Sequence, residues 1–394
     1  MNSTPPKQLS CGVCGAASIE IIDTFSSLPR ATSDCRPFAP GGRLGICKVC
    51  HTVQKPADPQ WEADASAIYS RYDIFRQAAG GAEQRVFDQA SGESLRRSDK
   101  VLKRLQAAFP FAATGRALDV GCGNGPTLQA LSELAPGWQL YGHEISDTNA
   151  ARLAKIPGFQ KLYTGDPADI EGPFNLITLF HSLEHLPDPV AGLAGLRGKL
   201  APGGVLLVEV PNVRTNIYDL VVADHRSHFD PGTLATAGRN AGWPHVMVFD
   251  DWAFKELTLL AAESPLPASL TPALAEGWQR EDVQKRVDWL AALVKTATGV
   301  AEHSKSFGLF GTAIAGTWMF GPLADKVAFF VDEDPARIGQ QHEGRPIVGP
   351  DQVPAGSVVF VPLLPDVAKS VAERLGRHGV DARLPPALNL APSH

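Results

Sequence analysis

Short apolar runs alternate with helix-like segments through the middle of this chain. The runs lie at residues 140–144, 174–180 and 204–210, and a proline and two glycines precede the last of them. Apolar runs of this length, separated by helix-like segments, are typical of buried parallel strands. Residues 111–262 are therefore predicted to form a doubly wound α/β sheet, which binds ligands at the carboxyl ends of its strands.

A second alternating pattern follows near the end of the chain. Residues 307–316 read as a glycine turn before a helix, and strand-like runs cover 326–332 and 358–362. This pattern indicates a small Rossmann-like lobe over residues 300–394. Residues 263–299 are expected to be a helical linker, with three apolar residues that pack in a core: Trp278, Val287 and Trp289.

The first part of the chain carries a different pattern. Residues 1–55 hold paired cysteines and a strand-like run at 19–25, so they are expected to form a small β-domain. Residues 56–110 are charged and are expected to be a helical connector, with apolar residues at helical spacing in 81–89 and 96–105.

Three aromatic residues lie in a loop-like part of this connector: Tyr69, Tyr72 and Phe75. Aromatic side chains in such a place either cover a ligand pocket or belong to an ordinary core. The sequence leaves both alternatives open.

Composition and charge narrow the class of protein. The chain has 394 residues, of which 44% are hydrophobic and 20% charged, as in globular proteins of two or three domains. A net charge of −6 argues against a dedicated nucleic-acid binder. No long apolar run and no signal-peptide pattern are found, so we expect a soluble cytoplasmic protein that does not bind membranes. The oligomeric state stays open.

A glycine turn follows the first predicted strand of the sheet. Asp119 ends the strand, and Gly121, Gly123 and Gly125 alternate before a helix-like segment. Glycines let a ligand approach the backbone, and the helix start adds free N–H groups. An acid inside the turn would repel a pyrophosphate but suits a cationic amino acid. The order D-x-G-x-G-x-G resembles the S-adenosylmethionine (SAM) site of class I methyltransferases.

Two further acids follow later strands of the same sheet. Glu144 ends the second strand, where an acid can accept hydrogen bonds from both ribose hydroxyls. Asp166 lies where an acid can meet the adenine amino group, and Asp119 is expected near the methionine part of SAM. A surface acid and a packing turn without a ligand are the alternatives.

Four cysteines are spaced as metal ligands. Cys11 and Cys14 form one C-x-x-C pair, and Cys47 and Cys50 form another. Two such pairs complete a tetrahedral zinc site, and four protein ligands leave no open position, so the metal is expected to be structural. Disulfides or free thiols are the alternative. Two neighbouring residues are possible substitutes in the ligand set: Cys35 and His51.

A histidine-rich segment follows the fourth strand. His181, Glu184 and His185 read H-x-x-E-H, which superficially resembles an inverted zinc-protease motif. Pro187 follows too soon for a metal-binding helix, so this interpretation is rejected. His181 is expected to border the cofactor or the substrate. The other two residues either act in the site or lock the loop by hydrogen bonds.

The best candidates for catalysis follow the fifth strand, in a polar loop over residues 223–229 that is expected to face the pocket. Methyl transfer needs an in-line nucleophile, which often needs a base, and histidine has a suitable pKa. His225 is the predicted base, and Asp224 would orient its ring or serve as a second base. The alternative is a histidine pair, His225 and His228, that only tethers the loop.

Three features together resemble the three-domain sugar C-methyltransferases of deoxysugar biosynthesis. They are the four-cysteine module, the SAM core with its H-x-x-E-H-x-P-D-P segment, and the last lobe with the runs 331–335 and 344–347. The resemblance implies SAM and zinc as cofactors, a nucleotide-activated sugar as acceptor, and a substrate-shaping C-terminal lobe. It also implies that a Tyr-x-Glu-His segment supplies the base that deprotonates C3 of a 4-keto sugar.

This chain departs from that segment. Val222 replaces the tyrosine, Asp224 replaces the glutamate and His225 keeps the histidine, whereas Tyr218 is out of register. An O- or N-methyltransferase of a secondary metabolite or a surface-polysaccharide precursor is therefore an alternative. A SAM-binding scaffold without catalysis is another. The glycine turn of the last lobe, followed by Asp332, could instead bind NAD.

Overall fold

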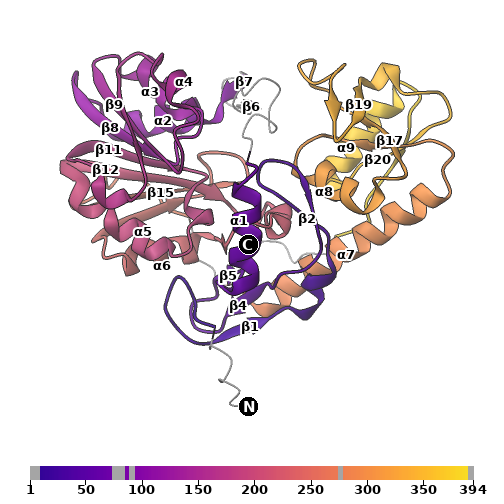
Figure 1. The fold of residues 1–394 in the computed structure, drawn as a ribbon, viewed down its shortest axis with the longest axis horizontal. Helices are drawn as coiled ribbons and strands as arrows, with labels where there is room; N and C mark the ends of the chain where they lie inside the picture. Colours follow the sequence, from indigo (N-terminus) through magenta and orange to yellow (C-terminus); the bar gives the residue numbers. More distant parts are fainter. Residues whose placement is uncertain (1–8, 73–84, 88–93, 274–277, 389–394) are drawn as a thin grey trace.

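The computed structural model describes residues 9–72, 85–87, 94–273 and 278–388. Figure 1 shows two lobes side by side, with the N-terminal module below and between them. One lobe holds the large central sheet, and the other holds the C-terminal sheet. Helix α1 (Pro59–Tyr69) lies between the two lobes.

The largest sheet of the described residues has seven strands in the order β10-β9-β8-β11-β12-β15-β14. Its first five strands are parallel, and β15 is antiparallel to both of its neighbours. The strands are β8 (Gly115–Val120), β9 (Trp138–Glu144), β10 (Phe159–Thr164), β11 (Phe174–Phe180), β12 (Leu200–Pro211), β14 (His245–Phe249) and β15 (Glu256–Ala262). The predicted doubly wound α/β sheet is confirmed.

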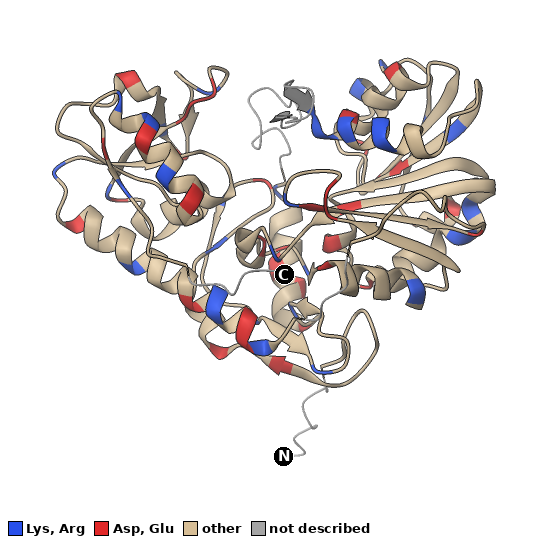
Figure 2. Cartoon of the chain, turned by 180° about the vertical axis from the view of Figure 1, so that it is seen from behind, with Lys and Arg blue, Asp and Glu red and all other residues tan. Residues whose placement is uncertain are grey.

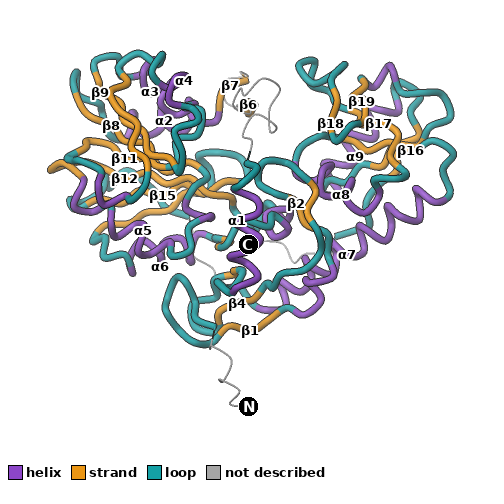
Figure 3. Tube along the Cα trace, in the orientation of Figure 1, coloured by secondary structure: helices purple, strands orange, loops and turns teal. Residues whose placement is uncertain are grey.

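Helices cover both faces of this sheet, as expected for parallel strands with apolar residues on both sides (Figures 1 and 3). They are α2 (Arg97–Ala108), α3 (Pro126–Leu134), α4 (Ala150–Leu153), α5 (Pro189–Gly195) and α6 (Pro231–Asn240). Pro126, Pro189 and Pro231 stand in the first turn of their helices, where a missing N–H costs nothing.

The N-terminal module is built from short strands. They are β1 (Ile19–Ile21), β2 (Arg30–Ala31), β3 (Pro37–Phe38), β4 (Gly45–Cys47) and β5 (Val53–Gln54). The strand expected over 19–25 is shorter than predicted, because a 3-10 helix, η1 (Asp23–Ser27), begins after it and buries Phe25. β13 (Ser227–His228), which comes from the predicted polar loop, completes the sheet β1-β4-β5-β13.

The connector differs in part from its prediction. Helix α2 confirms the helical spacing over 96–105. The helix expected over 81–89 is wrong, since residues Arg85–Phe87 form β6, which pairs with β7 (Ser94–Arg96); residues 81–84, 88 and 89 are outside the described part. Tyr69 lies at the end of α1 rather than in a loop, and Phe75 lies outside the described residues.

The C-terminal lobe is a second α/β unit. Its sheet runs β18-β19-β17-β16-β20-β21, and all neighbours pair in parallel except β18 and β19. The strands are β16 (Phe307–Phe310), β17 (Val327–Val331), β18 (Gln341–His342), β19 (Arg345–Val348), β20 (Val358–Phe360) and β21 (Asp381–Arg383), and the helices are α7 (Arg280–Glu302), α8 (Ile314–Leu323) and α9 (Pro365–Gly376). The linker helix begins at Arg280. Residues 264–273 were expected to be helical, and they are not.

One hydrophobic core joins the N-terminal module to the C-terminal lobe. It contains Phe25 of the module, Trp278 and Trp289 of the linker, and Trp318 of α8. The Trp318 indole donates a hydrogen bond to the backbone oxygen of Pro29 at 2.6 Å. The predicted anchors Trp278, Val287 and Trp289 all lie in this core.

Charged residues of both signs are interspersed along α7 and over both lobes in Figure 2. Among the described helices, none combines the length and the apolar composition needed to cross a membrane.

Candidate active site

A cavity of about 1410 Å³ opens at the carboxyl ends of β8, β9 and β11. The glycine turn lines one side of it. The cavity extends to the start of α8 in the C-terminal lobe, where Ala313, Ile314 and Arg337 line it. Such edges of parallel sheets are where ligands bind, so we take this cavity as the candidate active site.

The predicted glycine turn has the backbone that only glycine adopts readily. Gly121, Gly123 and Gly125 have φ angles of 75°, 53° and 88°. A Cβ on Gly121 would lie 2.6 Å from the Cβ of Ser182. Gly121 and Gly123 line the cavity, whereas Gly125 is the left-handed residue before α3 and does not line it.

Glu144 holds this turn in place. Its Oε1 accepts the backbone N–H of Gly123 at 2.7 Å, and its Oε2 accepts the N–H of Ile145 at 2.9 Å. The carboxylate ends β9 and lines the cavity, as the sequence predicted. Each carboxylate oxygen can accept a further hydrogen bond besides these two.

The other two predicted acids also line the cavity. Asp119 is 1% exposed, and its Oδ1 accepts the hydroxyl of Thr178 at 2.7 Å. Asp166 is exposed at the start of the 3-10 helix η4 (Pro167–Asp169), where its Oδ1 accepts the N–H of Ala168 at 2.8 Å. The structure thus brings Asp119, Glu144 and Asp166 to one edge of the sheet.

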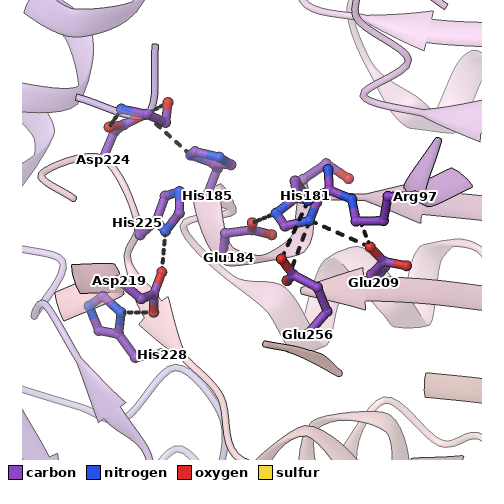
Figure 4. Close-up of polar contacts among 12 residues, drawn as sticks. Arg97, His181, Glu184, His185, Glu209, Asp219, Asp224, His225, His228 and Glu256 are labelled. Atoms are coloured by element: carbon purple, nitrogen blue, oxygen red, sulfur yellow. Dashed lines mark hydrogen bonds and ion pairs between the residues drawn. The ribbon is translucent and has the colours of Figure 1, made fainter. Parts of the chain in front are cut away.

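His181 lies among three carboxylates (Figure 4). Its Nδ1 is 3.3 Å from Glu184 Oε1, and its Nε2 is 3.5 Å from Glu256 Oε2 and 3.7 Å from Glu209 Oε1. Burial alone would lower the pKa of His181, but the surrounding glutamates raise it to about 10. His181 is therefore cationic at neutral pH and unsuited to accept a proton there.

One basic residue completes this charged cluster. Arg97 of α2 places its Nε 3.0 Å from Glu209 Oε1, and burial raises the pKa of Glu256 to about 7. Sequence reasoning missed both glutamates and the arginine. Glu209 offered one signal, because it is a single acid inside the apolar run of β12.

In the loop after β11, a hydrogen bond holds the His185 side chain. Residues Leu183–His185 form a 3-10 helix, η5, too short for a zinc-protease helix. His185 Nδ1 lies 2.9 Å from the hydroxyl of Tyr69 and 3.4 Å from Asp224 Oδ2. Tyr69 and Tyr72 line the cavity, in agreement with one of the two alternatives left open for these aromatic residues.

His225 lines the cavity, and a carboxylate binds its Nδ1. Its Nδ1 lies 2.6 Å from Oδ1 of Asp219, and its ring stands edge-on to the His185 ring with centroids 4.6 Å apart (Figure 4). Asp219 belongs to the 3-10 helix η7 (Ile217–Val221). Burial opposes its charge, but His228 and His225 hold the pKa of Asp219 well below its usual range.

Asp224 does not face the cavity. It is fully buried, its Oδ1 accepts the N–H of Ser33, and its Oδ2 accepts the hydroxyl of Ser33 and lies near His185. The predicted polar loop is in fact buried throughout residues 222–230. Burial is possible because the N-terminal module supplies the polar partners.

Asp219 and Lys55 were missed by the sequence interpretation, whereas His228 belongs to the predicted segment 223–229. Asp219 Oδ2 lies 2.5 Å from Nδ1 of His228, whose Nε2 lies 2.8 Å from Nζ of Lys55. The signal was an aspartate six positions before the predicted base, in a stretch that is otherwise apolar. Lys55 carried no local signal.

The four predicted cysteines form one cluster. Their Sγ atoms all lie within 4.8 Å of one another, and the pairs Cys11–Cys50 and Cys14–Cys47 are 3.5 Å apart. A disulfide needs about 2.05 Å, whereas ligands 2.3 Å from one tetrahedral zinc lie close to these separations. The donor set therefore fits structural zinc. Cys35 and His51 do not belong to this cluster.

Two other groups of residues have metal-like spacing: His181 with Glu209 and Glu256, and Glu184 with His185 and His225. Both groups are already joined by ion pairs and hydrogen bonds to Arg97, Tyr69 and Asp219. We assign no metal to them.

The C-terminal turn has partners of its own. Asp332 Oδ2 accepts the hydroxyl of Thr312 at 2.9 Å, and Arg337 donates to the same hydroxyl. A Cβ on Gly316 would lie 1.9 Å from the oxygen of Gly311, so this glycine serves the close packing of helix on strand.

Comparisons with known proteins agree with the central sheet. Residues 94–246 match a family model described as a methyltransferase domain. A trans-aconitate 2-methyltransferase of Deinococcus radiodurans is 36% identical over 111 residues, which cover 27% of this chain and 42% of that one. A malonyl-[acyl-carrier protein] O-methyltransferase of Alcanivorax borkumensis is 29% identical over 186 residues, 45% of this chain and 60% of that one.

This chain spans less than two thirds of either relative. Among solved structures, a S-adenosylmethionine-dependent methyltransferase from Clostridium acetobutylicum covers 44% of this chain and 93% of its own, with 11% identity and a TM-score of 0.35. The predicted doubly wound sheet is confirmed, and residues 94–246 match the predicted methyltransferase domain. The three-domain sugar C-methyltransferase family stays a prediction.

Proposed function

We propose that the protein is a SAM-dependent methyltransferase whose active site is the cavity over the glycine turn. The observation that carries this proposal is the contact between Glu144 and Gly123. It fixes an acid beside a bent backbone at the carboxyl end of the methyltransferase-domain sheet. A nucleoside with vicinal hydroxyls and a cationic amino acid fits these groups.

SAM would lie across the turn. Glu144 would accept the ribose hydroxyls, Asp166 the adenine amino group, and Asp119 would lie near the methionine ammonium. SAM supplies an electrophilic methyl group on a positively charged sulfur. His181 borders the cavity beside Ser182 and would shape the space around that methyl group.

We propose a nucleotide-activated sugar as the acceptor, methylated at carbon. The module order supports this proposal. The cavity also reaches the C-terminal lobe, which leaves room for an acceptor as large as a nucleotide sugar. Arg337, at the far end of the cavity, would meet an anionic part of the acceptor. In this proposal the C-terminal lobe shapes the substrate pocket and binds no dinucleotide of its own.

His225 would act as the general base. Asp219 accepts its Nδ1 proton, so Nε2 is the ring nitrogen that can take a proton from the acceptor. The bond from the acceptor to the methyl carbon forms as the bond from that carbon to sulfur breaks. The electron pair of the carbon–sulfur bond goes to sulfur, and S-adenosylhomocysteine leaves as a neutral thioether. Asp224, by contrast, would position the segment and not touch the acceptor.

The substitution His225→Asn tests this role. Turnover of SAM to S-adenosylhomocysteine is expected to fall by about 10²–10⁴-fold, with unchanged SAM affinity by calorimetry. The matched control is His245→Asn, at the start of β14 and away from the cavity lining. Full activity of His225→Asn would remove this histidine from the mechanism.

A second candidate is an O- or N-methyltransferase. The similarity to a malonyl-[acyl-carrier protein] O-methyltransferase favours it, and so does Val222 in place of the tyrosine that the sugar family carries. Product NMR on the transferred ¹³C-methyl group separates carbon, oxygen and nitrogen acceptors by chemical shift. SAM binding without turnover on any acceptor would leave a non-catalytic scaffold.

The cysteine cluster would hold one structural zinc ion. Zinc there stabilises the fold of the module and takes no part in methyl transfer. The acceptor is expected to be a small molecule rather than a nucleic acid, given the net charge of −6.

A further inference from the structure

A continuous row of buried polar groups leads from the cavity into the N-terminal module. It begins at His225, passes through Asp219 and His228, and ends at Lys55, with separations of 2.6, 2.5 and 2.8 Å. Figure 4 shows Asp219 between its two histidines. The exposed fraction of each residue is 7% or less, so water does not compete for these contacts.

The direction of each proton follows from chemistry. The carboxylate of Asp219 accepts from Nδ1 of His228, so a neutral His228 carries its proton on Nδ1, and its Nε2 accepts from Nζ of Lys55 whether that nitrogen is an ammonium or an amine. A carboxylate only accepts, so Asp219 accepts the Nδ1 protons of both histidines. His225 is therefore left with an unprotonated Nε2, the nitrogen that a general base needs.

Lys55 is held for this purpose by three partners. Its Nζ also donates to the backbone oxygen of His225 at 2.9 Å, and it lies 5.8 Å from the centroid of the Phe25 ring. Only 2% of the residue is exposed. Burying an ammonium group without a direct carboxylate partner is costly, so a position of this kind calls for a reason.

We propose that Lys55, His228 and Asp219 form a positioning relay that fixes the tautomer of His225 and keeps the charge of Asp219 available to it. This inference rests on the proposed role of His225 as base. Without Lys55, His228 would gain a second proton and draw the charge of Asp219 toward itself. The base would then lose part of the support that stabilises its protonated form after proton transfer.

The relay makes the cysteine module part of the active site. Lys55 directly follows β5, whose Gln54 donates to Sγ of Cys11 at 3.1 Å. β5 pairs with β13, which carries His228, and the N–H of Lys55 donates to the oxygen of Arg226 at 2.8 Å. The module that the zinc ion would clamp thus sets the position of Lys55, three side-chain contacts behind the predicted base.

Other charged groups around the relay come from several elements. They are Arg30 of β2, Glu184 and His185 of η5, and Asp224. Burial and then the Lys55 charge hold the pKa of His228 down at about 4, while Asp219 opposes them. Burial lowers the pKa of Lys55 to about 7. The test therefore compares the relay with and without Lys55 in an otherwise unchanged protein.

The experiment is NMR of the full chain labelled with ¹⁵N and ¹³C at histidine, with signals assigned by His225→Asn and His228→Asn. At pH 8 the wild-type protein is expected to show His225 and His228 both protonated at Nδ1 and unprotonated at Nε2. In Lys55→Met the His228 titration is expected to move up toward the ordinary histidine range, and the burial that remains keeps the pKa of His228 below that range. Lys48→Met, on the exposed side of the same module, is the control and should leave both histidines unchanged.

Two results would overturn the relay. One is a wild-type His225 that carries its proton on Nε2, which needs no variant to observe. The other is a His228 titration that stays in place in folded Lys55→Met. Neither reading requires methyl transfer, so the relay can fail or survive independently of the proposed reaction.

Activity supplies a further readout. If the protein transfers methyl groups, Lys55→Met should lower kcat with KM unchanged, and the loss should grow as the pH falls and His228 becomes protonated. A loss that is equal at all pH values would show a merely structural role for Lys55.

Discussion

Ser33 and Asp224, 191 positions apart in the chain, are joined by two hydrogen bonds. The backbone N–H of Ser33 donates to Oδ1 at 2.9 Å, and its hydroxyl donates to Oδ2 at 2.5 Å. Asp224 is fully buried, and burial would disfavour its charge, but His185 and Ser33 lower its pKa. The contact fixes the residue before the predicted base to the N-terminal module.

Ser33→Ala should therefore weaken activity without abolishing it. The variant keeps the backbone donor and loses one hydrogen bond to a buried carboxylate, which is worth about 1.5–3 kcal/mol in stability. We expect a lower melting temperature, a several-fold fall in kcat and unchanged SAM affinity. Ser26→Ala, whose hydroxyl is exposed and bonds within its own turn, is the control. Wild-type stability in Ser33→Ala would argue that Asp224 needs no anchor.

Glu144→Gln should weaken SAM binding. The amide can still accept the N–H of Gly123, but it has no charge and loses charge-assisted bonds to the ribose hydroxyls. A loss of about 1.5–3 kcal/mol of binding free energy predicts that the dissociation constant of SAM, measured by calorimetry, rises roughly tenfold or more. Glu171→Gln, exposed and away from the cavity lining, should bind like the wild type. Equal affinities in the two variants would contradict the ribose assignment.

Metal content should depend on the cysteine cluster alone. The protein is expected to hold one zinc ion per chain, and Cys50→Ser should lose it, with a large fall in melting temperature because zinc closes the module. Cys35→Ser, which lies outside the cluster and lines the cavity, should keep the ion. Elemental analysis measures both. Zinc retained by Cys50→Ser at full stoichiometry would show that another ligand set binds it.

Stability should rise with pH because of Lys55. Its pKa falls from 10.5 to about 7 on folding, so the unfolded chain binds more protons between these two pH values. The free energy of unfolding then increases with pH across that window, by up to about 1.4 kcal/mol per pH unit. Urea denaturation of the wild type and of Lys55→Met at pH 7, 8, 9 and 10 gives the difference between their free energies of unfolding. A difference in unfolding free energy that does not change with pH would contradict a lowered pKa of Lys55 in the folded protein.

Sequence patterns located the sheet and the turn because both are local signals. The apolar run 174–180 coincides with β11, and Glu144, the acid predicted to end a strand of the same sheet, ends β9 and lies in the cavity wall. Each pattern reflects a buried strand and the residue that directly follows it. Such features depend on a few consecutive residues, which a single sequence displays.

The residues that hold His225 and Asp224 in place could not be predicted from local sequence patterns. Lys55 lies 170 positions from His225, and Ser33 lies 191 positions from Asp224. Residues 222–230 look like an exposed polar loop, yet they are buried because the N-terminal module meets their polar groups. A polar run is buried only when distant partners exist, and no local pattern announces them. For the same reason Arg85–Phe87, expected in a helix, forms a strand once β7 is there to pair with it.

The most direct test of the account is a crystal structure of the protein with S-adenosylhomocysteine. The account predicts the ribose hydroxyls within hydrogen-bond distance of Glu144, the adenine near Asp166, and the sulfur over the turn on the side of the cavity that His181 and His225 line. A nucleoside bound elsewhere, or a cavity blocked at the glycine turn by its own side chains, would contradict the central claim.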